Sequence, residues 1–190
     1  MGKLTVVEHV TLDGVMQAPA RADEDERDGF AHGGWAVPGN DEVMGSEMGK
    51  RLGGGGAILL GRRTYEDFRR VWPGREEPYA DVLERTRKYV VSRTLREPLP
   101  WANSVLVDDV GAVAGIKQRE EGLTVHGSGE LVRSLARLGL VDEYLLMTHP
   151  LLLGTGRRLF EGISENLRLV DSVTTTTGVV IGTYGKGEDT

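Results

Sequence analysis

The sequence predicts an α/β protein of three layers, with a mostly parallel central sheet, helices on both faces and an antiparallel C-terminal edge. Strand patterns alternate with amphipathic helical patterns through the first two-thirds of the chain, an order typical of parallel strands joined by helices. After Phe160 only strand patterns follow, which predicts the antiparallel edge. With 190 residues and no internal repeat, the whole chain, 1–190, is expected to form one domain.

The N-terminal third is expected to contain a strand, a long loop and a helix. Lys3–Val10 is rich in valine and predicts a buried strand. A polar, glycine-containing loop spans Met16–Gly34, and either Asn40 or Asp41 can cap the helix that follows.

The middle of the chain alternates between short apolar runs and helical segments. Thr64 and Asp67 have the spacing of a capping box and predict a helix start. Further helices are expected at Pro78–Thr86 and Val110–Arg119. Buried strands are predicted at Ala57–Leu60, Tyr89–Ser92, Ser104–Val107 and Leu123–His126.

A glycine turn, Gly127-Ser128-Gly129, leads from a strand into an amphipathic helix that Gly139 is placed to end. Another strand follows this helix. The last two strand patterns, Leu167–Val173 and Gly178–Tyr184, predict an antiparallel pair joined through Thr174–Thr177.

Composition excludes several classes of protein. A net charge of -6 argues against a nucleic-acid binder, although a local basic cluster can still hold a small anion. No apolar run is long enough to cross a bilayer, and there is no hydrophobic leader pattern, so a cytoplasmic protein without membrane partners is expected. The chain has no cysteine, and its histidines have no metal-ligand spacing, so no metal site is expected. Each histidine is interpreted as structural or solvent-facing.

Three predicted strand ends carry groups suited to phosphate. These are Gly61-Arg62-Arg63-Thr64 at a helix start, Ser92-Arg93 after a strand, and the Gly127-Ser128-Gly129 turn. A helix N-terminus offers free N–H groups and a positive dipole end, and guanidinium groups pair with phosphate. Each element has a simpler interpretation as well: a capped helix with solvated arginines, a polar loop and a compact turn.

Taken together, several motifs resemble the C-terminal reductase domain of the bifunctional riboflavin-biosynthesis deaminase/reductase, whose fold is that of dihydrofolate reductase. The GSGELV turn, the GLVDE helix exit and the HPLLLGTGRRLF run carry this resemblance. It implies NADPH as cofactor, because the three phosphate-type elements match the superfamily's nucleotide-binding elements in order. The implied cofactor contacts are Gly61, Arg62, Arg63, Thr64, Ser92, Arg93, Gly127, Ser128, Gly129, Glu130 and Leu131.

The resemblance also gives two catalytic candidates, Asp13 and Asp41. Asp13 lies in the loop that matches the family's mobile loop, although an aspartate before glycine is also a common turn former. When Trp35–Gly39 is laid on the tryptophan loop of dihydrofolate reductase, Asn40 takes the place of the proton-relaying carboxylate, and Asp41 is next to it. This departure weakens an assignment as a folate reductase.

Substrate contacts are expected from Trp35, Phe68 and Arg75. The two aromatic rings could line a pocket for a flat heterocycle, or they could pack in the core. Arg75 falls on the arginine that binds the folate carboxylate in dihydrofolate reductase, or it is a solvated surface residue. The acidic, proline-containing segment that carries a phosphate-binding arginine in the riboflavin enzymes is not found in this sequence.

The resemblance implies an NADPH-dependent reductase like the riboflavin-biosynthesis 5-amino-6-(5-phosphoribosylamino)uracil reductase. It would transfer hydride to a small heterocyclic or sugar-derived substrate. Dihydrofolate reductase activity and a catalytically weak NADP-binding protein are the alternatives. A homodimer is also expected, because related reductases pair through their sheet edges. His149–Phe160 is either a surface for this dimer or an internal strand and turn.

Overall fold

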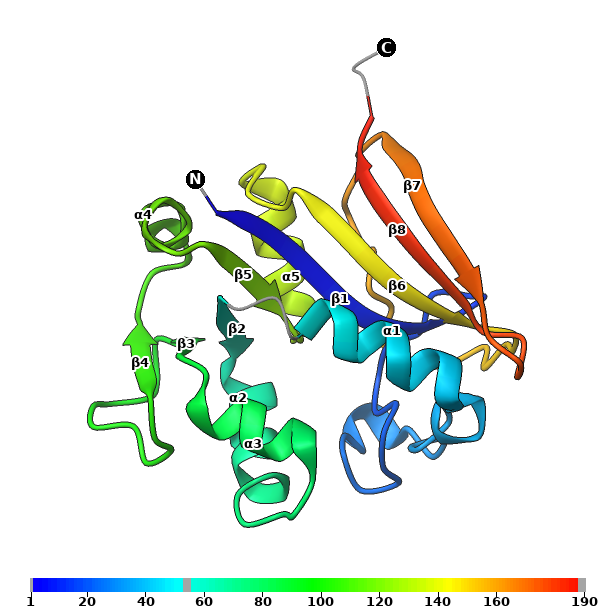
Figure 1. Cartoon of the computed structure of the whole chain (residues 1–190), viewed down its shortest axis with the longest axis horizontal. Helices are drawn as coiled ribbons and strands as arrows, with labels where there is room; N and C mark the ends of the chain where they lie inside the picture. The colour runs from blue at the N-terminus through cyan, green and yellow to red at the C-terminus, as the bar shows by residue number, and fades with distance from the viewer. Residues whose placement is uncertain (1, 53–55, 188–190) are drawn as a thin grey trace. The chain divides into compact units, whose positions relative to one another are not determined.

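The computed structural model describes residues 2–52 and 56–187. Its strands form one eight-stranded sheet in the order β4-β3-β2-β5-β1-β6-β8-β7 (Figure 1). The strands are β1 (Lys3–Thr11), β2 (Ala57–Gly61), β3 (Lys88–Val91), β4 (Ser104–Val107), β5 (Gly122–Val125), β6 (Glu143–His149), β7 (Leu167–Thr174) and β8 (Val180–Lys186).

The helices follow the predicted alternation with the strands. They are α1 (Glu42–Leu52), α2 (Arg62–Val71), α3 (Pro78–Arg85), α4 (Val113–Arg119) and α5 (Gly129–Arg137), with 3-10 turns η1 (Arg27–Gly29), η2 (Val37–Gly39) and η3 (Val110–Ala112). β2 pairs in parallel with β3 and β5, and β3 pairs in parallel with β4. β8 is antiparallel to both β6 and β7. The predicted fold class, including its antiparallel C-terminal edge, is therefore confirmed.

The chain divides into two compact units. The first unit comprises Met1–Thr5 and Gly55–Val141, and the second comprises Val6–Gly54 and Asp142–Thr190. That the whole chain folds as one domain stays a prediction.

In the first unit, β2 is buried along its whole length. Ile58 and Leu60 cluster with Tyr65 of α2, Leu83 of α3 and Trp101. Because side chains alternate along a strand, the fully buried Leu59 points to the opposite face. There α5 contacts β2, and its own buried residues include Leu131, Val132 and Leu135. Helices therefore cover both faces of the parallel strands in this unit.

A buried lysine fixes the passage from α3 to β3. Lys88 is fully buried, and its Nζ donates to the carbonyl oxygens of Leu83 at 2.6 Å and Thr86 at 2.8 Å. The last carbonyls of a helix have no partner within the helix, so this ammonium satisfies groups that burial would leave unpaired. Nζ also lies 4.5 Å from the centre of the Trp101 ring. Burial lowers the pKa of Lys88 to about 8.

The second unit has its apolar core between α1 and the antiparallel strands. Val7 of β1 and Met44 of α1 pack with Leu145, Met147, Val179 and Ile181. Asp41 caps α1, because its Oδ1 accepts the N–H of Met44 at 2.8 Å. Of the two predicted caps, Asn40 and Asp41, the structure selects Asp41.

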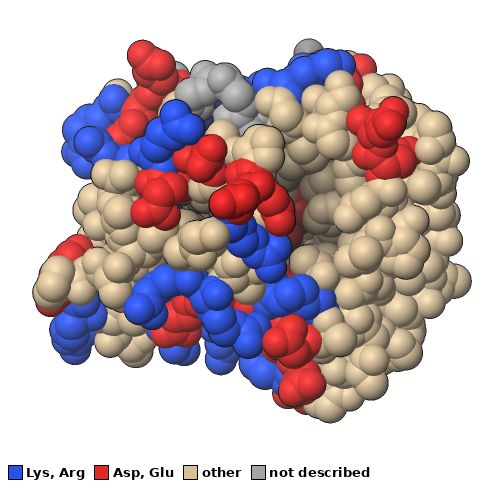
Figure 2. Space-filling view, turned by 60° about the horizontal axis from the view of Figure 1, so that its bottom comes forward, with Lys and Arg blue, Asp and Glu red and all other residues tan. Residues whose placement is uncertain are grey.

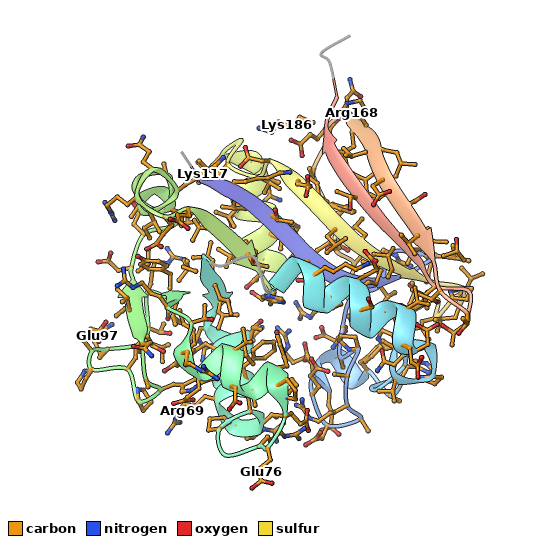
Figure 3. All side chains as sticks on the ribbon, viewed as in Figure 1. Arg69, Glu76, Glu97, Lys117, Arg168 and Lys186 are labelled. Carbon is orange, nitrogen blue, oxygen red and sulfur yellow. The ribbon has the colours of Figure 1, made fainter. Side chains whose placement is uncertain are left out.

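β7 ends the sheet and is exposed over most of its length. Leu169 is 54% exposed and Val170 is 49% exposed. The pairing with β8 shifts between Leu169 and Asp171. Figure 3 shows Arg168 and Lys186 at the same end of this antiparallel pair.

Three sequence predictions about local structure need correction. The capping box at Thr64 is wrong, since α2 already begins at Arg62 and no side chain caps it. The expected helix over Val110–Arg119 is split into η3 and α4, with Asp109 capping the first part through the N–H of Gly111. The last strand runs beyond Tyr184, to Lys186.

No helix in the described ranges is both long enough and apolar enough to span a membrane.

Candidate functional site

The carboxyl end of β2 touches the glycine turn that follows β5. The N–H of Gly61 donates to the carbonyl of Gly127 at 3.0 Å. A Cβ atom on Gly61 would lie 2.6 Å from Ser128 Oγ and 3.1 Å from Ser128 N, closer than non-bonded atoms approach. The absence of a side chain at Gly61 therefore allows two neighbouring strand ends to meet.

Two helices begin at this contact, and neither has a side-chain cap. α2 starts after Gly61, whose extended backbone (φ -74°, ψ 158°) makes it the residue that caps the helix. α5 starts after Ser128, which is also extended. Gly127 has a φ of 86°, which suits glycine, and the Gly127–Ser128 peptide bond is cis. Within the part of the chain that the structure describes, no side chain caps the first-turn N–H groups of either helix, and an anion such as a pyrophosphate fits such a pair of helix starts.

The Ser92-Arg93 element lies on the other side of β2. Gly61 is in register with Val91 of β3, and Ser92 follows directly. Ser92 is 7% exposed, and its Oγ accepts the N–H groups of Thr94 at 3.2 Å and Leu95 at 3.1 Å. Its hydroxyl therefore shapes the turn. Arg93 is exposed, and its guanidinium has no partner among the described residues.

The other predicted cofactor residues around α2 and α5 differ in what they can offer. Arg62 is half-buried, and its guanidinium pairs with Glu66 at 3.2 Å, whereas Arg63 is exposed. Leu131 points into the core, so only its backbone could reach a ligand. Glu130 is exposed in the first turn of α5. The structure thus brings the three phosphate-type elements to one edge of the sheet, with backbone N–H groups and arginines as the donors.

Basic side chains are not confined to this edge. On the face shown in Figure 2, lysine and arginine form a band that aspartate and glutamate interrupt. Such a mixed surface suits a small anion bound at one point better than a long polyanion.

His126, the residue before the glycine turn, was interpreted from the sequence as structural or solvent-facing. Its Nε2 is buried and has no hydrogen-bond partner among the described residues. Burial lowers the pKa of His126 to about 4, so the ring is neutral at pH 7. The Phe68 ring lies 6.3 Å away, measured between ring centres. A buried polar atom without a partner was not visible in the sequence pattern.

The predicted substrate residues Phe68 and Arg75 both contact the ring of Trp72, in the first unit. Phe68 contacts Trp72 edge-on at 6.2 Å, and Arg75 lies 5.3 Å from the Trp72 ring centre. Arg75 also pairs with Glu77 at 3.4 Å and is exposed. A substrate role for either residue stays a prediction.

The carboxylate of Asp13, in the second unit, accepts hydrogen bonds from three groups. Its carboxylate accepts from Thr11 Oγ1 at 2.6 Å, from Leu153 N at 3.2 Å and from Gly154 N at 2.8 Å. Arg158 adds an ion pair at 3.6 Å. The Thr11 and Gly154 hydrogen bonds lower the pKa of Asp13 to about 2. The carboxylate ties two loops together and holds no proton near pH 7.

Asp41 is engaged in the same way. Besides capping α1, it accepts from Thr176 N at 2.7 Å and from Thr176 Oγ1 at 2.6 Å. The Thr176 hydrogen bonds are the main reason that the pKa of Asp41 is lowered. Asn40 is exposed and follows η2. Both predicted catalytic carboxylates therefore have structural partners, and neither carries a proton to donate.

Trp35, the remaining predicted substrate residue, is buried in the second unit. It packs with Val15 and Phe30, and its Nε1 donates to the carbonyl of Gln17 at 2.7 Å. Its ring meets His149 edge-on at 5.2 Å. His149 Nε2 in turn lies 2.8 Å from His9 Nδ1, so one ring donates a hydrogen bond to the other. These contacts give Trp35 a packing role.

Glu8 was not singled out in the sequence, although it stands in the middle of the valine-rich strand β1. It is 7% exposed, and its Oε1 has no hydrogen-bond partner among the described residues. Burial and the nearby charge of Glu24 raise the pKa of Glu8 to about 8. A charged residue type within an otherwise apolar strand was the signal that could have revealed it.

No metal site is evident within residues 2–52 and 56–187, since no group of three or more histidine, aspartate or glutamate side chains is placed to bind an ion. The second unit has a cavity of about 310 Å³ lined by Gln17, Arg27, Asp28, Phe30, Thr155, Gly156, Arg157 and Glu161. Arg27 pairs with Asp25, and Arg157 pairs with Asp28.

Comparison with known proteins identifies one matching family and one related sequence. The family model of the RibD C-terminal domain matches residues 2–181. An uncharacterized protein of Bacillus subtilis strain 168, YyaP, is 30% identical over 133 residues, covering 65% of this chain and 70% of YyaP.

Two solved structures share the fold. One, from Shewanella sp. PV-4 and provisionally assigned to riboflavin biosynthesis, has a TM-score of 0.65 and 19% identity, with 98% of this chain and 99% of that chain covered. The other, a pyrimidine reductase-like protein from Corynebacterium diphtheriae, has a TM-score of 0.65 and 13% identity over 99% and 93% of the two chains. The fold is thus dihydrofolate-reductase-like.

The neutral state of His126 predicts a loss of stability in acid. A histidine whose folded-state pKa is lowered stabilises the fold above its unfolded pKa, and this stability is lost as the pH falls. Between pH 6.5 and about 4, His126 should therefore lower the free energy of unfolding by at most about 3 kcal/mol. Denaturant melts from pH 7 to pH 4 should show a shallower acid decline in His126→Gln than in the wild type.

The exposed His32 provides the matched control. His32→Gln should follow the wild-type curve. Equal acid slopes in His126→Gln and the wild type would mean that folding does not lower the pKa of His126.

Proposed function

Because the chain belongs to the RibD C-terminal domain family, whose members are reductases, we propose that it is an NADPH-dependent reductase. It transfers hydride to a C=N or C=O carbon of a small heterocyclic or sugar-derived substrate. The observation that carries the proposal is the meeting of two uncapped helix N-termini at Gly61 and Ser128, with Arg93 beside them. The donor set fits a dinucleotide with an additional phosphate.

In this proposal the first unit binds and orients the cofactor. The N–H groups at the starts of α2 and α5 hold the pyrophosphate, and Arg63 adds positive charge. Arg93 pairs in a bidentate manner with the 2′-phosphate, which NADPH has and NADH lacks. The bound cofactor supplies the hydride. The protein's contribution is orientation, because fixing the reacting groups removes an entropic part of the barrier.

Folate reduction is the weaker candidate. Asn40 stands where dihydrofolate reductase has its carboxylate, and the neighbouring Asp41 is engaged by Met44 and Thr176. A binding protein without catalysis would retain NADPH binding and show no NADPH oxidation. Steady-state oxidation with a panel of C=N and C=O heterocycles that includes dihydrofolate distinguishes these cases.

We further propose a homodimer formed through β7. This strand ends the sheet that the described residues form, and Leu167, Leu169 and Val170 are exposed on it. A second copy would cover this apolar edge. Leu152 and Phe160, in the other candidate surface, are exposed as well.

NADPH should raise the melting temperature of the protein. Ligand at 100 times its dissociation constant adds about 2.7 kcal/mol of stability, which corresponds to roughly 5–10 °C for a chain of this size. Differential scanning fluorimetry with NADPH up to millimolar concentration measures this shift. An unchanged melting temperature throughout would contradict the proposed cofactor.

Arg93→Ala should reduce NADPH affinity while leaving NADH affinity nearly unchanged. Charged hydrogen bonds contribute about 1.5–3 kcal/mol, and the exposure of Arg93 favours the lower half, so a ten- to thirtyfold loss is expected. Titration of both cofactors into both proteins measures this difference. Arg69→Ala is the control, since Arg69 is an exposed arginine in the last turn of α2 (Figure 3). Equal losses for NADH and NADPH would remove Arg93 from the 2′-phosphate site.

Light scattering after size exclusion should give the wild type twice the chain mass of 20.7 kDa. Leu169→Lys should shift the protein to a monomer, because a lysine on the apolar edge would be buried without a partner. Leu138→Lys is the control, since Leu138 is exposed at the end of α5 in the first unit. A dimer that survives Leu169→Lys would place the interface elsewhere.

A further inference from the structure

The cavity of the second unit combines two arginines with an aromatic ring. Its volume of about 310 Å³ lies at the lower end of the range for small-molecule sites. The loop after β1 lines it with Gln17, Arg27, Asp28 and Phe30, and the loop after β6 lines it with Thr155, Gly156, Arg157 and Glu161. All of these residues belong to the second unit, so the cavity is formed within that unit.

Gln17 ties the two loops together around this cavity. Its side chain is buried, and its Oε1 accepts the N–H of Arg157 at 3.0 Å. Its Nε2 donates to the carbonyl oxygens of Asp25 at 3.2 Å and Arg27 at 3.1 Å. Because both ends of this buried amide are bonded, the cavity is formed before any ligand arrives. A ligand therefore does not have to order the loops when it binds.

Phe30 gives the cavity an apolar wall. The residue is buried, and its ring packs against Gly156, where a Cβ atom would lie 2.6 Å from Cε2 of the ring. Gly156 also has a φ of 105°, which suits glycine. The ring is thus fixed against the opposite loop, and it offers a surface for the apolar part of a small molecule.

Arg157 is only partly paired. Its Nη2 donates to Asp28 Oδ2 at 2.6 Å, whereas its Nε is buried and has no hydrogen-bond partner among the described residues. The N–H groups of Nε and Nη2 lie on the same edge of a guanidinium, and this edge binds both oxygens of a carboxylate. A buried donor without a partner is unfavourable. A ligand with two oxygens would satisfy both donors.

The charges around the cavity favour a ligand with a single negative charge. Arg27 is paired with Asp25, and Asp28 and Glu161 place two carboxylates in the lining. These carboxylates would repel a dianion such as phosphate more strongly than a monoanion. Asp28 can leave Arg157 at little cost, since its side chain is 70% exposed and exposed ion pairs contribute little.

We propose that this cavity binds a small organic carboxylate. The two ligand oxygens accept the N–H groups of Arg157 Nε and Nη2, with the ligand replacing Asp28 on Nη2. The apolar part of the ligand lies against Phe30. The proposed cofactor residues all belong to the first unit, so this second site is formed by other residues and does not rest on the proposed function.

Sodium benzoate is a suitable probe, because it joins a carboxylate to a flat apolar ring. In proton–nitrogen NMR of the wild type, the Nε–H signal of Arg157 and the amide signals of Thr155 and Gly156 should shift and saturate. A dissociation constant in the millimolar range is expected for so small a ligand. Benzamide, which has nearly the same shape and no charge, should bind at least about tenfold more weakly, since charged hydrogen bonds are stronger.

Two variants should change the benzoate affinity in opposite directions. Arg157→Lys keeps the positive charge but lacks the paired N–H groups, so the affinity should fall by about tenfold or more. Asp28→Asn removes the competing carboxylate and should tighten binding by about two- to fivefold, the range that an exposed ion pair contributes. A loss of fold cannot imitate both results. Arg168→Gln is the control, since Arg168 is an exposed arginine on β7 of the same unit (Figure 3), and it should leave the affinity unchanged.

Shifts that do not saturate, or that appear at exposed arginines in place of Arg157, would overturn the proposal. Equal affinity for benzoate and benzamide would do so too, as would wild-type affinity in Arg157→Lys. Tighter binding of inorganic phosphate than of benzoate would overturn the choice of a carboxylate. None of these titrations contains NADPH, so a failure here and a failure of the proposed function are distinguishable.

Discussion

The contact between Gly61 and Ser128 is the constraint on which the candidate cofactor site depends. Gly61 is the last residue of β2, and a side chain there would collide with Ser128 in the glycine turn after β5. Because β2 and β5 are neighbouring parallel strands, the helices that follow both begin at this point. The N–H groups of their first turns, which no described side chain caps, then lie at one edge of the sheet, and phosphate is the class of ligand that suits them. The register of β2 with β3 adds Ser92 and Arg93 to the same edge.

Carboxyl groups of the second unit differ in protonation state because their surroundings differ. Asp13 and Asp41 have backbone and hydroxyl donors, so each remains ionised and ties loops together. Glu8 has apolar neighbours and a like charge, so it remains protonated. Groups of the same chemical type thus differ in charge because hydrogen-bond donors reach some of them and not others.

Much of the fold and part of the site followed from the sequence, since both depend on local patterns. The valine-rich strands, most of the helices and Gly139, which has a φ of 66°, were located where the structure has them. The three phosphate-type elements were located at strand ends because each is a short motif, and their role as cofactor contacts stays a prediction. The start of α2 was misplaced, because the spacing of Thr64 and Asp67 imitates a capping box, whereas α2 begins after the extended Gly61, which Ser128 approaches closely. No local pattern contains that approach.

By itself, the sequence determined the class of fold, the order of its elements and the residues that could meet a phosphate, because periodicity and turn chemistry act over a few residues. Only the tertiary structure decided which polar groups find partners. Asp13 gains the N–H groups of Leu153 and Gly154 from a distant part of the chain, whereas Glu8 and His126 are enclosed without a partner for Oε1 and Nε2 among the described residues. Protonation depends on burial and on the donors within hydrogen-bonding distance, and both are properties of residues brought together by folding.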